Sequence, residues 1–139
     1  MKQVIIFILI IQTSLPGRTQ EIDWATTHNW KIYALNNKEA YYYSADTLMN
    51  FKSVRMNDSA VISFLSNSVV WPSGKSGTWM GVYIASYENA DKQFRKVVLS
   101  SYGGFLFESK SRRYYELPRN LRQSWNDFIV ENLKNVFEE

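Results

Sequence analysis

Residues 79–102, with the sequence WMGVYIASYENADKQFRKVVLSSY, decide which fold this chain predicts. Two segments within it, Trp79–Tyr87 and Phe94–Tyr102, are rich in β-branched and aromatic residues, and a polar turn separates them. Alternate side chains of the first segment form two apolar sets, one of Met80, Val82 and Ile84 and the other of Trp79, Tyr83 and Tyr87. Because both sets are apolar, the segment predicts a central strand that is covered on both faces.

Shorter segments of the same strand-like kind precede the central pair. They are Trp30–Leu35, Glu39–Tyr43, Phe51–Met56, Ala60–Leu65 and Val69–Trp71. Asn36 and Asn37 tolerate the positive φ of a tight hairpin, so we expect the first two segments to pair. We expect Asn57–Ser59 to reverse the chain before a strand at residues 60–65.

Two further candidate strands follow the central pair. They are Phe105–Phe107, which comes after the glycine turn 103–104, and Arg113–Leu117. The whole pattern predicts an α+β fold: an antiparallel β-meander of about six to eight strands, curled into a sheet or partial barrel. One C-terminal amphipathic helix closes this sheet.

That helix is predicted by a change of period after Pro118. A single apolar stripe at helical spacing contains Leu121, Trp125, Phe128, Ile129, Leu133, Val136 and Phe137, which predicts a helix over residues 121–137. Asn120 and Gln123 are placed to cap its start. The polar side of the helix carries more acidic than basic residues, which favours packing on the sheet over binding to anionic lipid.

Residues 1–17 have the pattern of a secretory signal peptide. A charged start leads into the apolar run Val4–Ile11, and Pro16 and Gly17 then break the pattern. The run is shorter than the ~20 apolar residues that a bilayer-spanning helix needs. We therefore expect export to the periplasm, the cell surface or the extracellular space, with no stable membrane anchor after leader removal. Residues 18–29 form a lead-in segment, and residues 30–139 form a single globular β-rich domain.

Composition excludes several classes of protein. The chain has no cysteine, so a disulfide framework, a cysteine zinc site and a cysteine nucleophile are all excluded. Lys2 and Arg18 account for two of the 16 basic residues, and the remaining fourteen face 13 acidic residues, which is a net charge of +1. Nucleic-acid binding needs a larger basic field, so no nucleic-acid partner is expected.

Motifs that would carry catalysis are sparse. His28 is the single histidine, so neither a transition-metal site nor a serine triad is predicted, and no cofactor is expected. Gly74-Lys75-Ser76 lacks the earlier glycine of a phosphate-binding loop. Asp46 and Glu108 flank strand segments and are the candidates for a catalytic carboxylate pair, although solvation at the surface explains them better. We predict that the protein is not an enzyme.

The best candidates for recognition are aromatic. Trp71 and Trp79 bracket a tract rich in glycine and serine that carries Lys75, and tryptophan is enriched in binding hot spots. Tyr41 and Tyr43 are a second candidate, because consecutive strand residues alternate between faces. The alternative for Trp71 and Trp79 is that both side chains point into the core. These residues predict a protein or glycan partner outside the cytoplasm and leave the oligomeric state open.

The stretch from Trp30 through Tyr42-Tyr43-Ser44-Ala45-Asp46-Thr47-Leu48, with strand pairs near Trp71 and Tyr83, resembles the bacterial surface-adhesin protein E family. That family consists of small exported β-rich domains, and the resemblance implies binding to extracellular proteins of a host. The leading hypothesis is a secreted or periplasmic non-enzymatic binding module for surface adhesion or protein recognition. The alternatives are an inhibitor or accessory subunit of an extracytoplasmic enzyme and, last, a carboxylate-dependent hydrolase.

Overall fold

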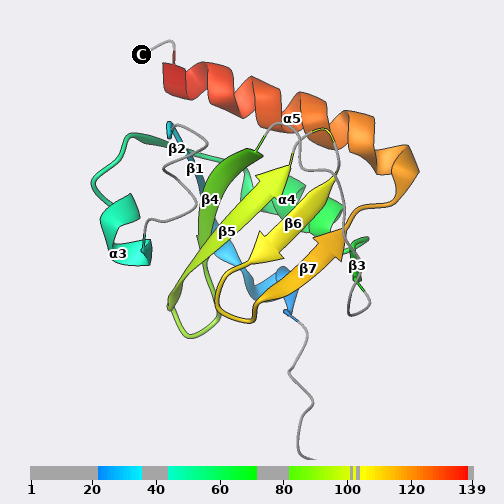
Figure 1. Ribbon diagram of the computed structural model, residues 1–139, viewed down its shortest axis with the longest axis horizontal. Helices are drawn as coiled ribbons and strands as arrows, with labels where there is room; N and C mark the ends of the chain where they lie inside the picture. The colour runs from blue at the N-terminus through cyan, green and yellow to red at the C-terminus, as the bar shows by residue number, and fades with distance from the viewer. Residues whose placement is uncertain (1–21, 36–43, 72–81, 101, 103, 138–139) are drawn as a thin grey trace, which may run out of the picture.

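The computed structural model describes residues 22–35, 44–71, 82–100, 102 and 104–137 (Figure 1). Its elements are the 3₁₀ helix η1 (Trp24–Thr26), β1 (His28–Tyr33), α3 (Ala45–Leu48), β2 (Ser53–Arg55), α4 (Asp58–Leu65), β3 (Val69–Val70), β4 (Val82–Glu88), β5 (Phe94–Ser100), β6 (Phe105–Glu108), β7 (Arg113–Glu116) and α5 (Arg119–Phe137). The predicted α+β fold is confirmed: a seven-stranded antiparallel sheet, not closed into a barrel, is joined by a C-terminal helix.

The strands lie in the order β2-β1-β4-β5-β6-β7-β3, so a four-stranded meander is extended on both sides. The predicted central pair is β4 and β5, whose register runs from Val82 opposite Ser100 to Glu88 opposite Phe94. Asn89 shapes the turn between them, because its Oδ1 accepts the N–H groups of Asp91 and Gln93 at 3.0 and 2.9 Å.

One face of the sheet, which we call the closed face, is covered by α4 and α5 (Figure 1). The 3₁₀ helix η1 adds Trp24 to the same core. Its strands contribute Trp30, Ile32, Ala85, Tyr87, Val97, Leu99, Leu106 and Tyr115, and all of them are buried. From α5, Trp125 and Ile129 pack into the same core with 1% and 0% of their surfaces exposed. The apolar stripe of α5 therefore covers a sheet face, as its period predicts.

The opposite face, which we call the open face, carries a smaller apolar cluster. Tyr33, Ile84 and Val98 are buried on it and pack with Leu48 of α3. Leu35, Phe51, Val82, Phe94 and Phe107 are only partly buried against this cluster. Among the described elements, the four-residue helix α3 packs on this face, against β5.

The strand predicted at residues 60–65 is wrong, because these residues lie in α4. The predicted reversal, Asn57–Ser59, is instead the start of that helix: Asn57 Oδ1 accepts the N–H of Ala60 at 2.9 Å. Val61 and Leu65, four residues apart, are buried on one side of it. The periodicity of so short an apolar run does not distinguish a helix from a strand, and here the Asn57 cap favours the helix.

Two element boundaries also differ from those predicted. Helix α5 begins at Arg119, directly after Pro118, so Asn120 lies inside the helix and does not cap it. The lead-in segment belongs to the fold: Trp24 is 8% exposed in the closed-face core, and β1 begins at His28. Strand β1 pairs with β2 and β4, and its predicted partner, residues 39–43, lies outside the described residues.

None of the helices within the described ranges is both long enough and apolar enough to cross a membrane. The predicted leader, residues 1–17, lies outside those ranges.

Candidate binding site on the open face

A depression of about 300 Å³ lies on the open face, along strand β1 and beside Ser53 of β2, Glu88 of β4 and Phe94 of β5. It is lined by Asn29, Lys31, Tyr33, Met49, Phe51, Ser53, Glu88 and Phe94. The strands bring together residues from four separate parts of the chain, because β1 pairs with both β2 and β4. The site therefore depends on the strand order and not on a local motif.

The apolar part of the depression is accessible to a partner. Met49, which follows α3, is 71% exposed and is one of three large exposed hydrophobic residues among those described. Phe51 and Phe94 line the same depression and are half-buried. Methionine adapts its shape to a partner, and flexible methionine surfaces are common at binding sites. This combination supplies an apolar contact surface next to a shaped hollow.

A bulge in β1 orders the polar rim. The register shifts between His28 and Lys31, and Asn29 has a φ of 52°. Asp58 of α4 holds the bulge, because its two carboxylate oxygens accept the N–H groups of Asn29 and Trp30 at 3.2 and 3.0 Å. The bulge turns the Asn29 side chain toward Glu88, to which its Nδ2 donates a hydrogen bond. A bulge that redirects a side chain at a cleft is typical of functional surfaces.

His28 lies beside the same carboxylate. Its Nε2 is 3.5 Å from Glu88 Oε2, and its Nδ1 is 3.3 Å from the carbonyl oxygen of Thr26. Glu88 thus has two polar neighbours, Asn29 and His28, at the rim of the depression. Both side chains of the His28–Glu88 pair are about one-third exposed.

A row of buried polar groups adjoins Tyr33, which lines the depression. Tyr33 Oη and Ser86 Oγ are 2.8 Å apart, and Lys96 lies directly opposite Ser86 on the next strand. Burial lowers the pKa of Lys96 and raises the pKa of Tyr33, whose rise the Ser86 hydrogen bond partly opposes. Ser86 is 1% exposed and Lys96 is 8% exposed. This burial argues against a serine nucleophile, because a substrate would have to reach the hydroxyl through the packed face.

Of the sequence-predicted binding residues, Trp71 is described. It is 8% exposed and packs on the open face near the opposite edge of the sheet, stacked on Tyr114 at 5.6 Å and edge-on to Phe105 at 4.7 Å. Its Nε1 donates to Glu116 Oε2 at 3.0 Å, and Arg122 of α5 donates to the other oxygen of that carboxylate. Trp71 is a packed, hydrogen-bonded residue, so truncating it would act first through stability.

The other four predicted binding residues, Tyr41, Tyr43, Lys75 and Trp79, lie outside the described residues. Lys31, Met49, Phe51 and Phe94 were not predicted as site residues. Met49 and Phe51 carry no local signal, since single exposed hydrophobic residues are common on protein surfaces.

The two candidate catalytic carboxylates do not form a pair. Phe107 belongs to the open-face cluster, so the next residue, Glu108, points to the closed face, whereas Asp46 lies on α3 over the open face. The Glu108 side chain closes its own turn by accepting the N–H groups of Lys110 and Ser111 at 3.2 and 2.6 Å. Within the described ranges, no three His, Asp or Glu side chains gather to hold a metal ion.

A second hollow, of about 280 Å³, lies where η1 meets the sheet end and includes Tyr87, Arg95 and Glu108 in its lining. Burial and the nearby Glu108 charge raise the pKa of Tyr87. Tyr87 and Glu108 are both 2% exposed, so neither offers much surface to a ligand. Their roles in the core and in the turn explain them.

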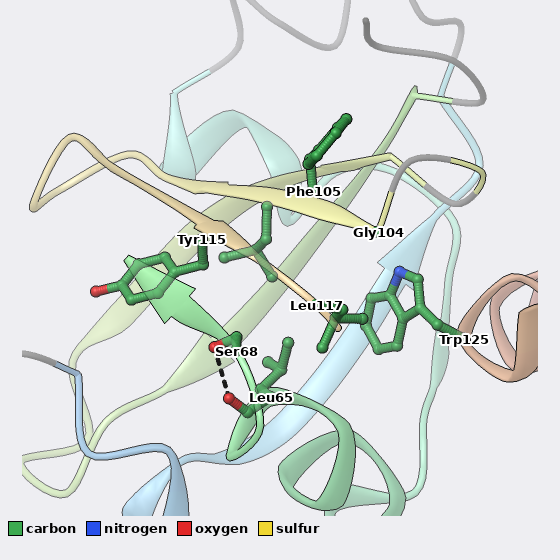
Figure 2. A pocket seen from close by; sticks show the side chains of 8 residues that line it. Leu65, Ser68, Gly104, Phe105, Tyr115, Leu117 and Trp125 are labelled. Atoms are coloured by element: carbon green, nitrogen blue, oxygen red, sulfur yellow. Dashed lines mark hydrogen bonds between the residues drawn. The ribbon is translucent and has the colours of Figure 1, made fainter. Parts of the chain in front are cut away.

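A third pocket lies inside the closed face (Figure 2). Leu65, Leu117 and Trp125 point toward one another in it, whereas Phe105 points away toward the open face. The pocket has no room for a water molecule, and Trp125 Nε1 is buried without a hydrogen-bond partner among the described residues. It is a packing gap and not a binding site.

Comparison with protein-family models, with curated proteins and with solved structures finds no match to this chain.

Proposed function

We propose that this protein is an exported, non-enzymatic binding module that recognises a partner through the depression on its open face. The observation that carries the proposal is a depression of about 300 Å³ with Met49, 71% exposed, at its border. Concave surfaces lined by apolar side chains with a few oriented polar groups are the usual form of a binding site. The partner would lie in the periplasm, at the cell surface or outside the cell.

The same surface supports binding better than it supports catalysis. Asn29 donates a hydrogen bond to Glu88, and His28 lies 3.5 Å from the same carboxylate, so the rim is ordered, which reduces the entropy lost when a partner binds. Phe51 and Phe94 offer aromatic area, which dominates interface energies. The carboxylates that a hydrolase would pair are separated by the sheet.

The proposal places the contact surface near the sheet edge formed by β2, whereas the sequence predicted it at Trp71, near the opposite edge. The resemblance to the adhesin family stays a prediction, and it agrees in kind with an exported domain that binds proteins. An inhibitor or accessory subunit would use the same surface against an extracytoplasmic enzyme.

Site-specific photocrosslinking in the cells that make the protein tests this directly. A photoreactive amino acid replaces Met49 in one version of the full chain and Tyr102 in a matched version. Tyr102 is 62% exposed and lies in the turn after β5, at the other end of the strand from Phe94. We expect discrete crosslinked adducts from position 49 and none from position 102.

A further substitution shows whether such adducts depend on the depression. Phe94→Asp in the Met49 crosslinking background should remove them while the protein still accumulates. Adducts from position 102 alone, or adducts from position 49 that survive Phe94→Asp, would contradict the proposal.

A further inference from the structure

We propose that the partner bound at this depression is an acidic peptide segment with a large apolar side chain beside its carboxylates. The inference rests on the proposed function, because it specifies the chemistry of the partner at the same site. Its evidence is the arrangement of charges along β1 and β2.

Two cations lie directly opposite each other on the open face. Lys31 of β1 and Arg55 of β2 are paired in the register. Met56 N–H donates to the Trp30 carbonyl at 2.9 Å, and Ala34 N–H donates to the Lys52 carbonyl at 3.0 Å. Hydrogen-bonded and non-hydrogen-bonded pairs alternate along an antiparallel ladder, so Lys31 and Arg55 form a non-hydrogen-bonded pair. In such a pair the opposing side chains come closest. Like charges at such a position destabilise a sheet.

Nearby acidic groups balance this pair only in part. Asp58 forms an ion pair with the Arg55 guanidinium at 3.5 Å, and its oxygens also accept the two backbone N–H groups of the β1 bulge. The Arg55 side chain remains 65% exposed. Glu88 is engaged by Asn29 and lies beside His28. Lys31 is exposed and makes no ion pair among the described residues.

The neighbouring strands add no negative charge along this row. On its other side Lys31 faces Ser86 of β4, and Ser86 faces the buried Lys96 of β5. Lys31 itself lines the depression, next to the apolar area of Met49 and Phe94. A carboxylate placed between Lys31 and Arg55 would relieve their repulsion, while an adjacent apolar side chain fills the hollow. A like-charge pair such as Lys31 and Arg55 lowers stability, and binding sites commonly keep such unfavourable arrangements because function requires them.

The first part of the test needs no partner. Lys31→Thr removes the like-charge pair without adding a charge near Glu88, and threonine suits a strand. Without any ligand, it should raise the melting temperature by about 1–4 °C, whereas Lys31→Arg, which keeps the pair, should leave it unchanged. Lys134→Gln, on α5, removes the same charge elsewhere and should have no such effect.

The second part uses random peptides displayed on phage and selected on the full-length chain. Enriched peptides should carry Asp or Glu next to Leu, Phe or Trp. Their affinity, measured as synthetic peptides by fluorescence anisotropy, should fall about threefold with Lys31→Thr and about tenfold with Lys31→Thr/Arg55→Thr. Lys31→Arg and Lys134→Gln should retain it, and added salt should reduce it.

Several outcomes would overturn the inference. One is enrichment of basic or uncharged peptides that still lose affinity with Met49→Asp, and in that case the proposed binding function stands. Another is selective capture of sulfated glycans with the same Lys31 dependence and no peptide binding. A Lys31→Thr variant that is not stabilised, or that binds acidic peptides as wild type does, also contradicts it. If no selected peptide is sensitive to Met49→Asp, the proposed function itself fails.

Discussion

The two faces of the sheet are both apolar, but they differ in what covers them. On the closed face, Trp30, Trp125 and Ile129 are between 0% and 1% exposed under a long helix. On the open face, the covering element within the described ranges is the four-residue helix α3, and Phe51 and Phe94 are half-buried beside an exposed Met49. The closed face therefore carries most of the stability, and the open face leaves more apolar surface exposed.

This difference explains why both faces of β4 are apolar in sequence. Apolar residues at every second position of a strand show that the sheet face they occupy is not fully exposed to solvent. They do not show whether that face is a core or a binding surface. The covering elements decide, and they come from distant parts of the chain.

The largest expected effect tests the closed face. Trp125→Ala should lower the free energy of unfolding by about 3–5 kcal/mol, because it removes a side chain that is 1% exposed and leaves a cavity. Ser124→Ala, at an exposed position of the same helix, should change it by less than about 0.5 kcal/mol. Asn126, on the opposite side of the predicted stripe, is a poor control because its Oδ1 is buried. Equal urea midpoints for the two variants would show that α5 does not close the core.

The next effect separates core from surface within the open face. Leu48→Ala should cost about 2–3 kcal/mol, since Leu48 is 0% exposed, yet a short helix can settle into part of the cavity. Met49→Ser, at the adjacent residue, should change the unfolding free energy by less than about 0.5 kcal/mol. Comparable losses in a thermal melt would mean that Met49 supports the fold and is not held ready for a partner.

Two buried tryptophans of the closed face sharpen the comparison further. Trp30 Nε1 donates to Thr27 Oγ1 at 2.9 Å, whereas Trp125 Nε1 has no partner among the described residues. Replacing each with Phe removes similar volume, but only Trp30→Phe breaks a buried hydrogen bond. Trp30→Phe should therefore cost about 1–2 kcal/mol more than Trp125→Phe in urea unfolding. The reverse order would mean that Trp125 Nε1 is satisfied in solution.

The smallest effect compares one tyrosine from each face at high pH. Burial raises the pKa of both, but the Glu108 charge adds to the rise at Tyr87, whereas the Ser86 hydrogen bond opposes it at Tyr33. The folded state then holds these protons above pH 10.0, where unfolded tyrosine loses them, so stability falls as the pH rises. Tyr87→Phe should flatten this fall more than Tyr33→Phe does. Identical slopes of unfolding free energy against pH would contradict it.

Much of the fold was predictable because its signals are local. The α5 stripe and the β4–β5 pair have long, regular periods. Helix α4 was misread because Ala60–Leu65 is short, and the Asn57 cap outweighs its strand-like composition. The depression could not be predicted, since it arises where β2, β1, β4 and β5 meet. Likewise, an indole at a strand end gives no indication of whether it packs inward, as Trp71 does.

Hydroxyl-radical footprinting is the most direct test of the claim that the open face is the recognition surface. The full chain is oxidised alone and in an extracytoplasmic fraction that contains its crosslinked partner, and oxidation is read by mass spectrometry. Met49 and Tyr102 are both largely exposed in the free protein, at 71% and 62%. We predict that the partner protects Met49 and leaves Tyr102 unchanged. Unchanged oxidation of Met49 together with protection of Tyr102 would contradict the account.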